Sequence, residues 1–458
     1  MLKEEIKKVV ESQHEYFIGG NTLSYKYRIS MLKKLKAAIK KYEEQIFVAL
    51  KGDLGKSEFE SYATEISIVY SEINHTVSHL RRWMKTKRVA TPIVSFGAVS
   101  KVYNQPYGVA LVMSPWNYPF QLTLAPVVAA MAAGNCVTIK PSSYSPNTSS
   151  LIQKIIGETF DDNYISVFQG NREINQILLE QKFDYIFFTG SVKVGKVVME
   201  SASRQLTPVT LELGGKSPCV VNCDADIKKT ALRIVWGKTV NSGQTCIAPD
   251  YILVHKDVKD KLVAEMLKAK KKFYGDSMIE SSDFGKIIRP QAFDGLVELF
   301  KDQKMLDGGK YDEKLQKIEL TFLDNPALDS PVMQREIFGP ILPIIPVENM
   351  KEAVKIIRKY DRPLAMYLFT KDKNVQKIMT QEIHFGGGCI NDTVMHIANG
   401  NMPFGGVGAS GMGRYHGKDG FDTFTHKKSV LKQNFLFDVP LRYAPYGKKL
   451  NLVKKILK

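Results

Sequence analysis

The stretch Tyr185-Ile186-Phe187-Phe188-Thr189-Gly190-Ser191-Val192-Lys193-Val194-Gly195 joins an apolar run to a glycine turn and a helical stretch that continues to Ala202. This pattern is typical of one strand-and-helix unit of an α/β sheet. The same alternation precedes it, from the apolar run Val109 to Met113, through the helical stretch Leu122 to Ala133, to the strand-like Cys136 to Ile139. Such alternation predicts parallel strands with right-handed crossovers. We therefore expect an α/β fold with a doubly wound, nucleotide-binding sheet.

A second cycle of strands and helices follows residue 215. It contains the apolar run Pro218 to Val221, a helical stretch from Ile227 to Lys238 and a lysine-rich helix from Val258 to Phe273. The 458 residues, 44% of them hydrophobic, exceed the roughly 250–300 residues at which a single core stops growing. The sequence therefore predicts a second α/β domain, which holds Cys246.

The net charge of +17, from 64 Lys and Arg against 47 Asp and Glu, is compatible with a nucleic-acid partner. The lysines, however, are spread along amphipathic stretches such as Leu32 to Lys41, and no nucleic-acid-binding motif accompanies them. We interpret the excess of positive charge as solvated helix faces and expect no nucleic-acid partner.

Cysteine spacing and hydropathy indicate a cytoplasmic protein. The first ten residues alternate charged and apolar side chains, unlike a signal peptide, and no window approaches the ~20 apolar residues of a membrane span. The basic, weakly amphipathic stretch Gly447 to Lys458 predicts at most a weak peripheral contact with anionic lipid. The cysteines lack the dense framework of a small secreted protein; they stand at positions 136, 219, 223, 246 and 389.

Two short runs carry the candidate chemistry. Asn241-Ser242-Gly243-Gln244-Thr245-Cys246 offers a thiol, and Leu211-Glu212-Leu213-Gly214-Gly215-Lys216 offers a carboxylate. A cysteine attacks as its thiolate, and a glutamate in an apolar cleft can exchange a proton near neutral pH. From these residues alone, Cys246 is equally compatible with a small buried hydrophobe, and Glu212 with a structural carboxylate beside the glycine turn. We assign Lys216 to structure.

Further motifs give these two residues a context. These motifs are Ser114 to Phe120, Phe188 to Ser191, Glu336 to Pro340 and Pro403 to Gly411. Together, and in this order, they resemble the aldehyde dehydrogenase superfamily over essentially the whole chain. Two segments resemble the class 3 branch of this superfamily. They are Gly243 to Tyr251, and Gly413 to Lys418 followed by Phe421 to Phe424. Members of that branch are short dimeric enzymes that act on medium-chain, long-chain and aromatic aldehydes.

The resemblance implies a role for each catalytic candidate. Cys246 would attack the aldehyde to form a thiohemiacetal, which loses hydride to nicotinamide and becomes a thioester. The side-chain amide of Asn117 and the backbone N–H of Cys246 would stabilise the oxyanion, since such donors are worth roughly 3–4 kcal/mol each. Glu212 would activate the water that hydrolyses the thioester.

The resemblance also implies a dinucleotide site built on a variant Gly-x-x-x-x-Gly turn, with Gly190, Ser191 and Gly195 in contact with the cofactor. Free N–H groups at a helix start favour a pyrophosphate. Lys140 matches the lysine that binds the adenosine ribose. Ser143 stands where many members carry a glutamate that holds the ribose 2′-hydroxyl, so we expect NADP to be accepted besides NAD.

Two more residues are assigned to the cofactor and four to the substrate pocket. Glu336 matches the glutamate on the nicotinamide ribose, with Phe338 packed nearby. The residues assigned to the pocket are Trp116, Tyr118, Thr245 and His416; for His416 the alternative is a satisfied surface or core histidine. We propose no metal site, because Cys219 and Cys223 lack the further ligands of a zinc set.

The expected organisation combines these assignments. Residues 1–85 and 104–211 form the dinucleotide-binding domain, to which 412–424 returns, and 212–411 form the catalytic domain. Residues 86–103 and 425–437 resemble the arms through which this family pairs subunits, which implies a homodimer, and 438–458 form a basic tail.

Two alternatives remain at this stage. The same Cys246 and Glu212 could serve a thiol esterase that needs no cofactor. A non-catalytic dinucleotide-binding protein could retain the fold, and its properties would not depend on the thiol.

Overall fold

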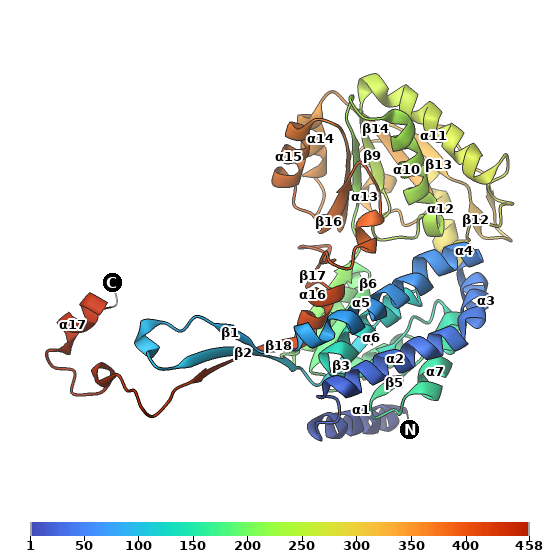
Figure 1. Ribbon diagram of the computed structural model, residues 1–458. Helices are drawn as coiled ribbons and strands as arrows, with labels where there is room; N and C mark the ends of the chain where they lie inside the picture. Colours follow the sequence, from blue (N-terminus) through green and yellow to red (C-terminus); the bar gives the residue numbers. More distant parts are fainter. Residues whose placement is uncertain (1, 457–458) are drawn as a thin grey trace.

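The computed structural model describes residues 2–456. Figure 1 shows two α/β bodies, one above the other, and an arm that extends to one side. The predicted α/β class is confirmed, with two large, mainly parallel sheets. Within the described residues, no helix combines the length and apolar character needed to span a bilayer.

The lower body contains a doubly wound sheet. Its strands are β3 (Val109–Met113), β4 (Cys136–Lys140), β5 (Ile165–Val167), β6 (Tyr185–Gly190), β7 (Val209–Leu213) and β17 (Gly411–Met412). They lie in the order β17-β7-β6-β3-β4-β5, and every pair from β7 to β5 is parallel. The chain moves outward from β3 through β5 and then returns to place β6 on the other side of β3. Ligands of such sheets bind at this switch point, outside the carboxyl ends of the strands.

Helices cover both faces of the lower sheet. They are α1 (Leu2–Ile18), α2 (Tyr25–Lys41), α3 (Glu43–Leu54), α5 (Ser67–Trp83), α6 (Gln121–Ala133), α7 (Pro146–Thr159), α8 (Arg172–Leu179), α9 (Val192–Ser203) and α16 (Gly417–Thr423). All 13 residues of α6 are buried, because it lies between β3 and β4 on one side and α2, α5 and α16 on the other. A helix buried on all sides is apolar on all sides.

Between α3 and α5 the chain forms the short helix α4 (Glu58–Ser61) and one π-helical turn, η1 (Tyr62–Ile66). Apolar residues recur at helical spacing from Ile29 to Leu50, and this stretch forms two helices, because α2 ends before Tyr42 and α3 begins after it.

The upper body contains the second sheet, in the order β10-β13-β14-β9-β8-β15-β16. Its strands are β8 (Pro218–Val221), β9 (Tyr251–His255), β10 (Met305–Asp307), β13 (Thr321–Asp324), β14 (Ile341–Val347), β15 (Ala365–Phe369) and β16 (Gly387–Ile390). The accompanying helices are α10 (Ile227–Thr239), α11 (Lys259–Tyr274), α12 (Pro290–Phe300), α13 (Pro331–Gln334), α14 (Met350–Ile357) and α15 (Lys373–Glu382). Two 3-10 turns are η3 (Val240–Gly243) and η5 (Met395–Ala398).

The arm is a three-stranded antiparallel sheet of β1 (Lys87–Val89), β2 (Val99–Pro106) and β18 (Thr425–Lys432). Two expected domain boundaries fall inside strands. β2 continues to Pro106, so the arm extends beyond residue 103, and β7 continues to Leu213, so Glu212 belongs to the lower sheet. In both places the ladder of backbone hydrogen bonds carries the strand past the predicted boundary.

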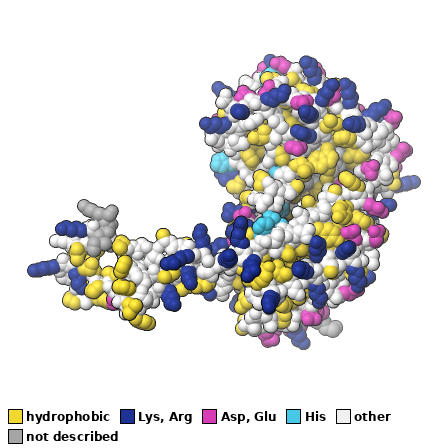
Figure 2. Space-filling model, in the orientation of Figure 1, with side chains coloured by type: hydrophobic (Ala, Val, Ile, Leu, Met, Phe, Trp, Pro, Cys, Tyr) yellow, Lys and Arg dark blue, Asp and Glu magenta, His cyan; other side chains and the backbone are white. Residues whose placement is uncertain are grey.

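Hydrophobic and basic side chains gather on the arm and on the tail beyond it, which ends in α17 (Lys449–Ile456) (Figure 2). Phe435 and Leu436 are fully or almost fully exposed there. The upper and lower bodies, by contrast, bury most of their large apolar side chains.

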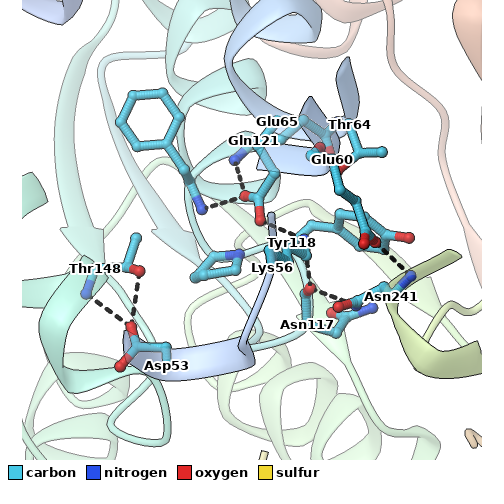
Figure 3. Close-up of polar contacts among 12 residues, drawn as sticks. Asp53, Lys56, Glu60, Thr64, Glu65, Asn117, Tyr118, Gln121, Thr148 and Asn241 are labelled. Carbon is cyan, nitrogen blue, oxygen red and sulfur yellow. Dashed lines mark hydrogen bonds and ion pairs between the residues drawn. The ribbon is translucent and has the colours of Figure 1, made fainter. Parts of the chain in front are cut away.

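Asp53, the penultimate residue of α3, caps helix α7. Its Oδ1 accepts the backbone N–H of Asn147 (3.1 Å). Its Oδ2 accepts the backbone N–H of Thr148 (2.8 Å) and the Thr148 hydroxyl (2.7 Å), as Figure 3 shows. Ser145, the residue before α7, makes no side-chain cap. A carboxylate from another helix therefore satisfies the free N–H groups of this helix start.

We predict that Asp53→Ala lowers the stability of the protein by about 1.5–3 kcal/mol, because the bonds lost involve a charged acceptor at a buried helix end. Thermal unfolding by circular dichroism measures the effect. Asp276→Ala, which removes an exposed carboxylate paired with Lys271, serves as the control and should melt like the parent. Equal melting temperatures for the two variants would contradict the capping role.

Candidate active site

Asn117 lies in the turn directly after β3 and is 3% exposed. Its side-chain Nδ2 donates to the carbonyl of Gln244 (3.0 Å), and its own backbone carbonyl accepts a hydrogen bond from Asn241 Nδ2 (2.7 Å). The turn from the lower body is thus bonded to the loop that leads to Cys246 in the upper body.

The loop before Cys246 has a left-handed backbone. Asn241, Ser242 and Gly243 have φ values of 52°, 53° and 73°, and such a conformation costs of order 1–3 kcal/mol at each non-glycine residue. At Gly243 a Cβ atom would lie 2.4 Å from the carbonyl oxygen of Gly339, so only glycine fits. Contacts elsewhere, such as Gln244 Nε2 to the Lys286 carbonyl (3.0 Å), hold the loop in place.

Glu212 stands on β7, where it pairs in register with Thr189 of β6 and Gly411 of β17. Its side chain is 3% exposed, and neither carboxyl oxygen has a hydrogen-bond partner among residues 2–456. Burial raises the pKa of Glu212 well above its usual value. Because a buried carboxyl without a partner is costly, its presence marks a functional site more readily than a structural one.

A cavity of about 280 Å³ lies where the two bodies meet, and Cys246 and Glu212 both line it. Tyr118 and Thr245 line it as well, joined by a hydrogen bond of 2.6 Å between their hydroxyl oxygens. The remaining wall is largely apolar and includes Leu122, Trp236, Met395, Ile397 and Phe404. The structure therefore brings the predicted thiol, carboxyl and two pocket residues together in one apolar space.

The cavity raises the pKa of the Cys246 thiol. The largest cause is burial, followed by the nearby carboxyl groups of Glu336 and Glu212, while the backbone N–H groups of Cys246 and Ile247 act in the opposite direction. The thiol is therefore protonated at neutral pH in this state, and reaction requires a base to remove its proton.

The residues predicted to hold the adenosine half of a dinucleotide lie at the carboxyl edge of the lower sheet. Lys140 ends β4, and Gly190 ends β6. Ser191 is exposed and caps α9, and Gly195 is buried so closely that a Cβ would lie 2.7 Å from Leu213. Burial lowers the pKa of Lys140 to about 8. Ser143 is exposed in the turn that follows β4.

The residues predicted to lie near the nicotinamide, Glu336 and Phe338, belong to the upper body. Glu336 lies against Gly214, where an added Cβ would approach the carboxyl oxygen to 2.0 Å. Burial, and secondarily Asp250, raises the pKa of Glu336 to about 8. Phe338 meets the ring of Trp116 edge to face at 5.4 Å, so the upper and lower bodies also touch here.

Two residues expected in the substrate pocket do not line this cavity. Trp116 instead packs on Phe338, on the side of the predicted cofactor residues. His416 is buried behind the wall, stacked on Phe404 at 5.4 Å, and its positive φ of 81° turns it away while Tyr415 faces the cavity. Burial lowers the pKa of His416 to about 4, which keeps the ring neutral.

Sequence reasoning missed several members of the site. Phe404 and Tyr415 line the cavity and were present in recognised motifs, but nothing in their spacing distinguished them from neighbouring residues.

Lys238, at the end of α10, is fully buried without a hydrogen-bond partner among the described residues, and burial lowers its pKa to about 8. Lys216 forms a buried ion pair with Asp250 (2.5 Å). No group of three or more potential metal ligands occurs within residues 2–456.

A doubly wound sheet, a second α/β body and a cavity between them that holds a thiol and an unpartnered carboxyl are features of an α/β enzyme. Comparison with protein families then narrows the class. A model described as the aldehyde dehydrogenase family matches residues 1–430, and the chain belongs to that family. The protein is therefore an aldehyde dehydrogenase, as the resemblance in its motifs predicted.

Three relatives illustrate the match. The chain is 47% identical to the 4,4'-diaponeurosporen-aldehyde dehydrogenase of Staphylococcus aureus, covering 97% of each chain. It is 41% identical to a dimeric NADP-preferring aldehyde dehydrogenase of Rattus norvegicus, covering 97% of this chain and 99% of that one. The substrate-bound structure of Staphylococcus aureus AldH superposes with a TM-score of 0.97 at 46% identity, covering 99% of both chains.

We predict that iodoacetamide modifies Cys246 slowly at pH 7 and progressively faster up to pH 10, because burial and two carboxyl groups keep the thiol protonated. Peptide mapping by mass spectrometry measures the rate, and the exposed Cys223 provides an accessible thiol in the same digest. In Glu212→Gln the Cys246 curve should shift to lower pH. A Cys246 rate that is already maximal at pH 7 would contradict this electrostatic description.

Proposed function

We propose that the protein oxidises apolar aldehydes to carboxylic acids with NAD or NADP, through a thiohemiacetal and a thioester on Cys246. The observation that carries the proposal is that Cys246 and Glu212, from different bodies, line one largely apolar cavity. The family membership supports the reaction class.

The first step is attack of Cys246 Sγ on the aldehyde carbon. The thiol must lose its proton, and of the two carboxyl groups whose charges act on it, Glu336 and Glu212, Glu212 is the one that lines the same cavity. With its own pKa raised by burial, Glu212 is a stronger base than an exposed carboxylate once it is ionised. The pair therefore favours proton transfer from thiol to carboxylate as the carbon–sulfur bond forms.

The attack places negative charge on the former carbonyl oxygen. The backbone N–H groups of Cys246 and Ile247 already act on the sulfur, and Asn117 Nδ2 is held two residues from the nucleophile by its bond to the Gln244 carbonyl. Nδ2 carries a second N–H, which supports its role as an oxyanion donor. Donors fixed in advance cost no reorganisation when charge develops.

A dinucleotide fits the residues at the sheet edge. Helix α9 begins with N–H groups that have no partner within the helix, Ser191 is exposed beside them, and Lys140 supplies a buried amine. Glu336, partly exposed opposite this edge, would hold the ribose nearer the reacting centre. When bound, the nicotinamide ring accepts the hydride of the thiohemiacetal.

Once the proton taken from the thiol has left Glu212 for solvent, Glu212 completes the cycle as the base that activates water. Hydrolysis breaks the carbon–sulfur bond, releases the acid and returns the proton to Cys246. A carboxyl free of structural hydrogen bonds, as Glu212 is within the described chain, is available for both proton transfers.

The substrate class follows from the cavity wall. Apart from Glu212, Cys246 and a few hydroxyl or amide groups, the wall is aliphatic and aromatic, which favours an apolar tail next to the aldehyde. We include fatty, aromatic and terpenoid aldehydes in this class; the relatives named 4,4'-diaponeurosporen-aldehyde dehydrogenase and aldehyde dehydrogenase family 3 member H1 support it.

We also propose a homodimer and a reducing, cytoplasmic environment. The outer strand β18 is exposed along nearly its whole length, and an unpaired edge can add strands from another subunit. The five cysteines are all free, as is usual where thiols stay reduced. For the basic tail we propose at most a weak peripheral contact with anionic lipid.

We predict that Cys246→Ser loses dehydrogenase turnover by about 10³-fold or more while it binds NAD with a nearly unchanged Kd, because the cofactor residues lie elsewhere. Stopped-flow absorbance of the reduced cofactor and fluorescence titration measure the two properties. Ester hydrolysis by the parent without any aldehyde-dependent reduction of the cofactor would favour the thiol esterase instead. Unchanged properties in Cys246→Ser would favour a non-catalytic protein.

We predict that kcat/KM for NAD and NADP differ by less than about a hundredfold, because Ser143 carries no charge that repels a 2′-phosphate. Ser143→Glu should lower kcat/KM for NADP by about tenfold or more and leave NAD nearly unchanged. Ser150→Glu, an exposed change on the following helix, controls for added negative charge. An equal loss with both cofactors would contradict the assignment of Ser143.

A further inference from the structure

Lys56 is a buried cation that the proposed chemistry does not use. It lies between α3 and α4, is 1% exposed, and forms an ion pair of 2.6 Å with Glu65 of η1 (Figure 3). Neither side chain of this pair is exposed to solvent. Removing two charges from water is expensive and rarely adds net stability, so the position of the pair calls for a reason other than stability.

The ammonium group of Lys56 also faces the turn that carries Asn117. Its Nζ lies 3.5 Å from the backbone carbonyl oxygen of Asn117 and 4.1 Å from the centre of the Tyr118 ring. The cation therefore touches two consecutive residues, one the proposed oxyanion donor and the other a wall of the cavity.

Glu65 fixes the far end of the same turn. Its Oε2 accepts the backbone N–H groups of Phe120 (2.8 Å) and Gln121 (3.1 Å) at the start of α6. Phe120, which precedes the helix, provides no side-chain cap. The Lys56–Glu65 pair thus spans the turn from Asn117 to Gln121 and holds both of its ends.

Glu60, from the same segment, holds the loop on the other side of the site. Its Oε1 accepts the backbone N–H of Asn241 (2.5 Å), the first residue with a left-handed backbone in the Cys246 loop. Asn241 in turn donates to the carbonyls of Asn117 and Gln244. Residues 56–65 therefore contact both the turn that carries Asn117 and the loop that leads to Cys246.

We propose that Lys56 is a positioning residue for oxidation of the aldehyde: with Glu65 it holds the backbone of Asn117, so that the Asn117 amide faces the oxygen bonded to the carbon that Cys246 attacks. This role rests on the proposed function of Asn117. Lys56 itself touches neither substrate nor cofactor in this role. A displacement of about 1 Å at such a group can cost of order a hundredfold in rate.

The test is a double-mutant cycle between Lys56→Met and Asn117→Ala. If Lys56 acts through Asn117, Lys56→Met lowers kcat by about 10–100-fold in the parent and by less than about threefold in Asn117→Ala. The fluorescence Kd for NAD stays within about twofold, because Lys140 and α9 are not touched. Lys56→Arg, which keeps the charge, should recover part of kcat.

The Lys56→Met protein leaves Glu65 buried without its partner, which can prevent folding. A second variant then provides the test. In Lys56→Met/Glu65→Gln the amide oxygen can still accept both N–H groups of α6, and no buried charge is left unpaired. The cycle with Asn117→Ala is then measured in that background, with the same expected loss and the same expected non-additivity.

Arg28→Met is the matched control. Arg28 is a buried cation that bonds the carbonyls of Thr22 and, at the opposite end of α6, Ala132. The Arg28→Met variant should have a lower melting temperature and an unchanged kcat per folded molecule. Equal fold-losses from Lys56→Met in both backgrounds, or no loss in the parent, would overturn the positioning role. An unchanged kcat in Asn117→Ala alone would instead overturn the proposed function of Asn117.

Discussion

The hydrogen bonds between the Asn117 turn and the Asn241 to Gln244 loop are the contacts on which the site depends. The turn belongs to the lower, doubly wound sheet, and the loop belongs to the upper body. Asn117 donates to Gln244, and Asn241 donates back to Asn117. Because Glu212 stands on the lower sheet and Cys246 on the upper body, these hydrogen bonds help to hold together the two sides of the cavity that they share.

Burial is the largest cause of the pKa shifts of the acids in that cavity and beside it. It raises the pKa of Glu212 and Cys246, and it raises that of Glu336 to about 8. Charged groups that serve structure, such as Lys216 with Asp250, are instead paired at close distance. Glu212, whose carboxyl oxygens have no hydrogen-bond partner among residues 2–456, differs in this respect from the paired charges of the scaffold.

Much of the fold could be predicted because its signals are local. The strands from Val109, Cys136 and Tyr185 and the helix from Val192 follow from apolar runs and glycine turns, and the structure places them where expected. Cys246, Glu212, Tyr118 and Thr245 were predicted as site residues, and they do line one cavity; their chemical roles stay predictions.

Other features depend on contacts between segments far apart in the chain. His416 was expected in the pocket, but a left-handed backbone and the ring of Phe404 place it behind the wall. The continuation of β7 to Leu213 depends on its neighbour β6. Lys56 and Glu65 carried no signal at all, because their meaning arises only when η1 reaches the start of α6.

Trapping the covalent intermediate tests the central claim most directly. Glu212→Gln is mixed with an apolar aldehyde such as hexanal and NAD at alkaline pH, where Cys246 loses its proton without the Glu212 carboxylate, and the mixture is quenched in acid and digested for mass spectrometry. The account predicts one acyl group per subunit on the peptide that contains Cys246, formed together with one equivalent of reduced cofactor. Reduced cofactor without an acylated Cys246, or an acyl group on another cysteine, would contradict it.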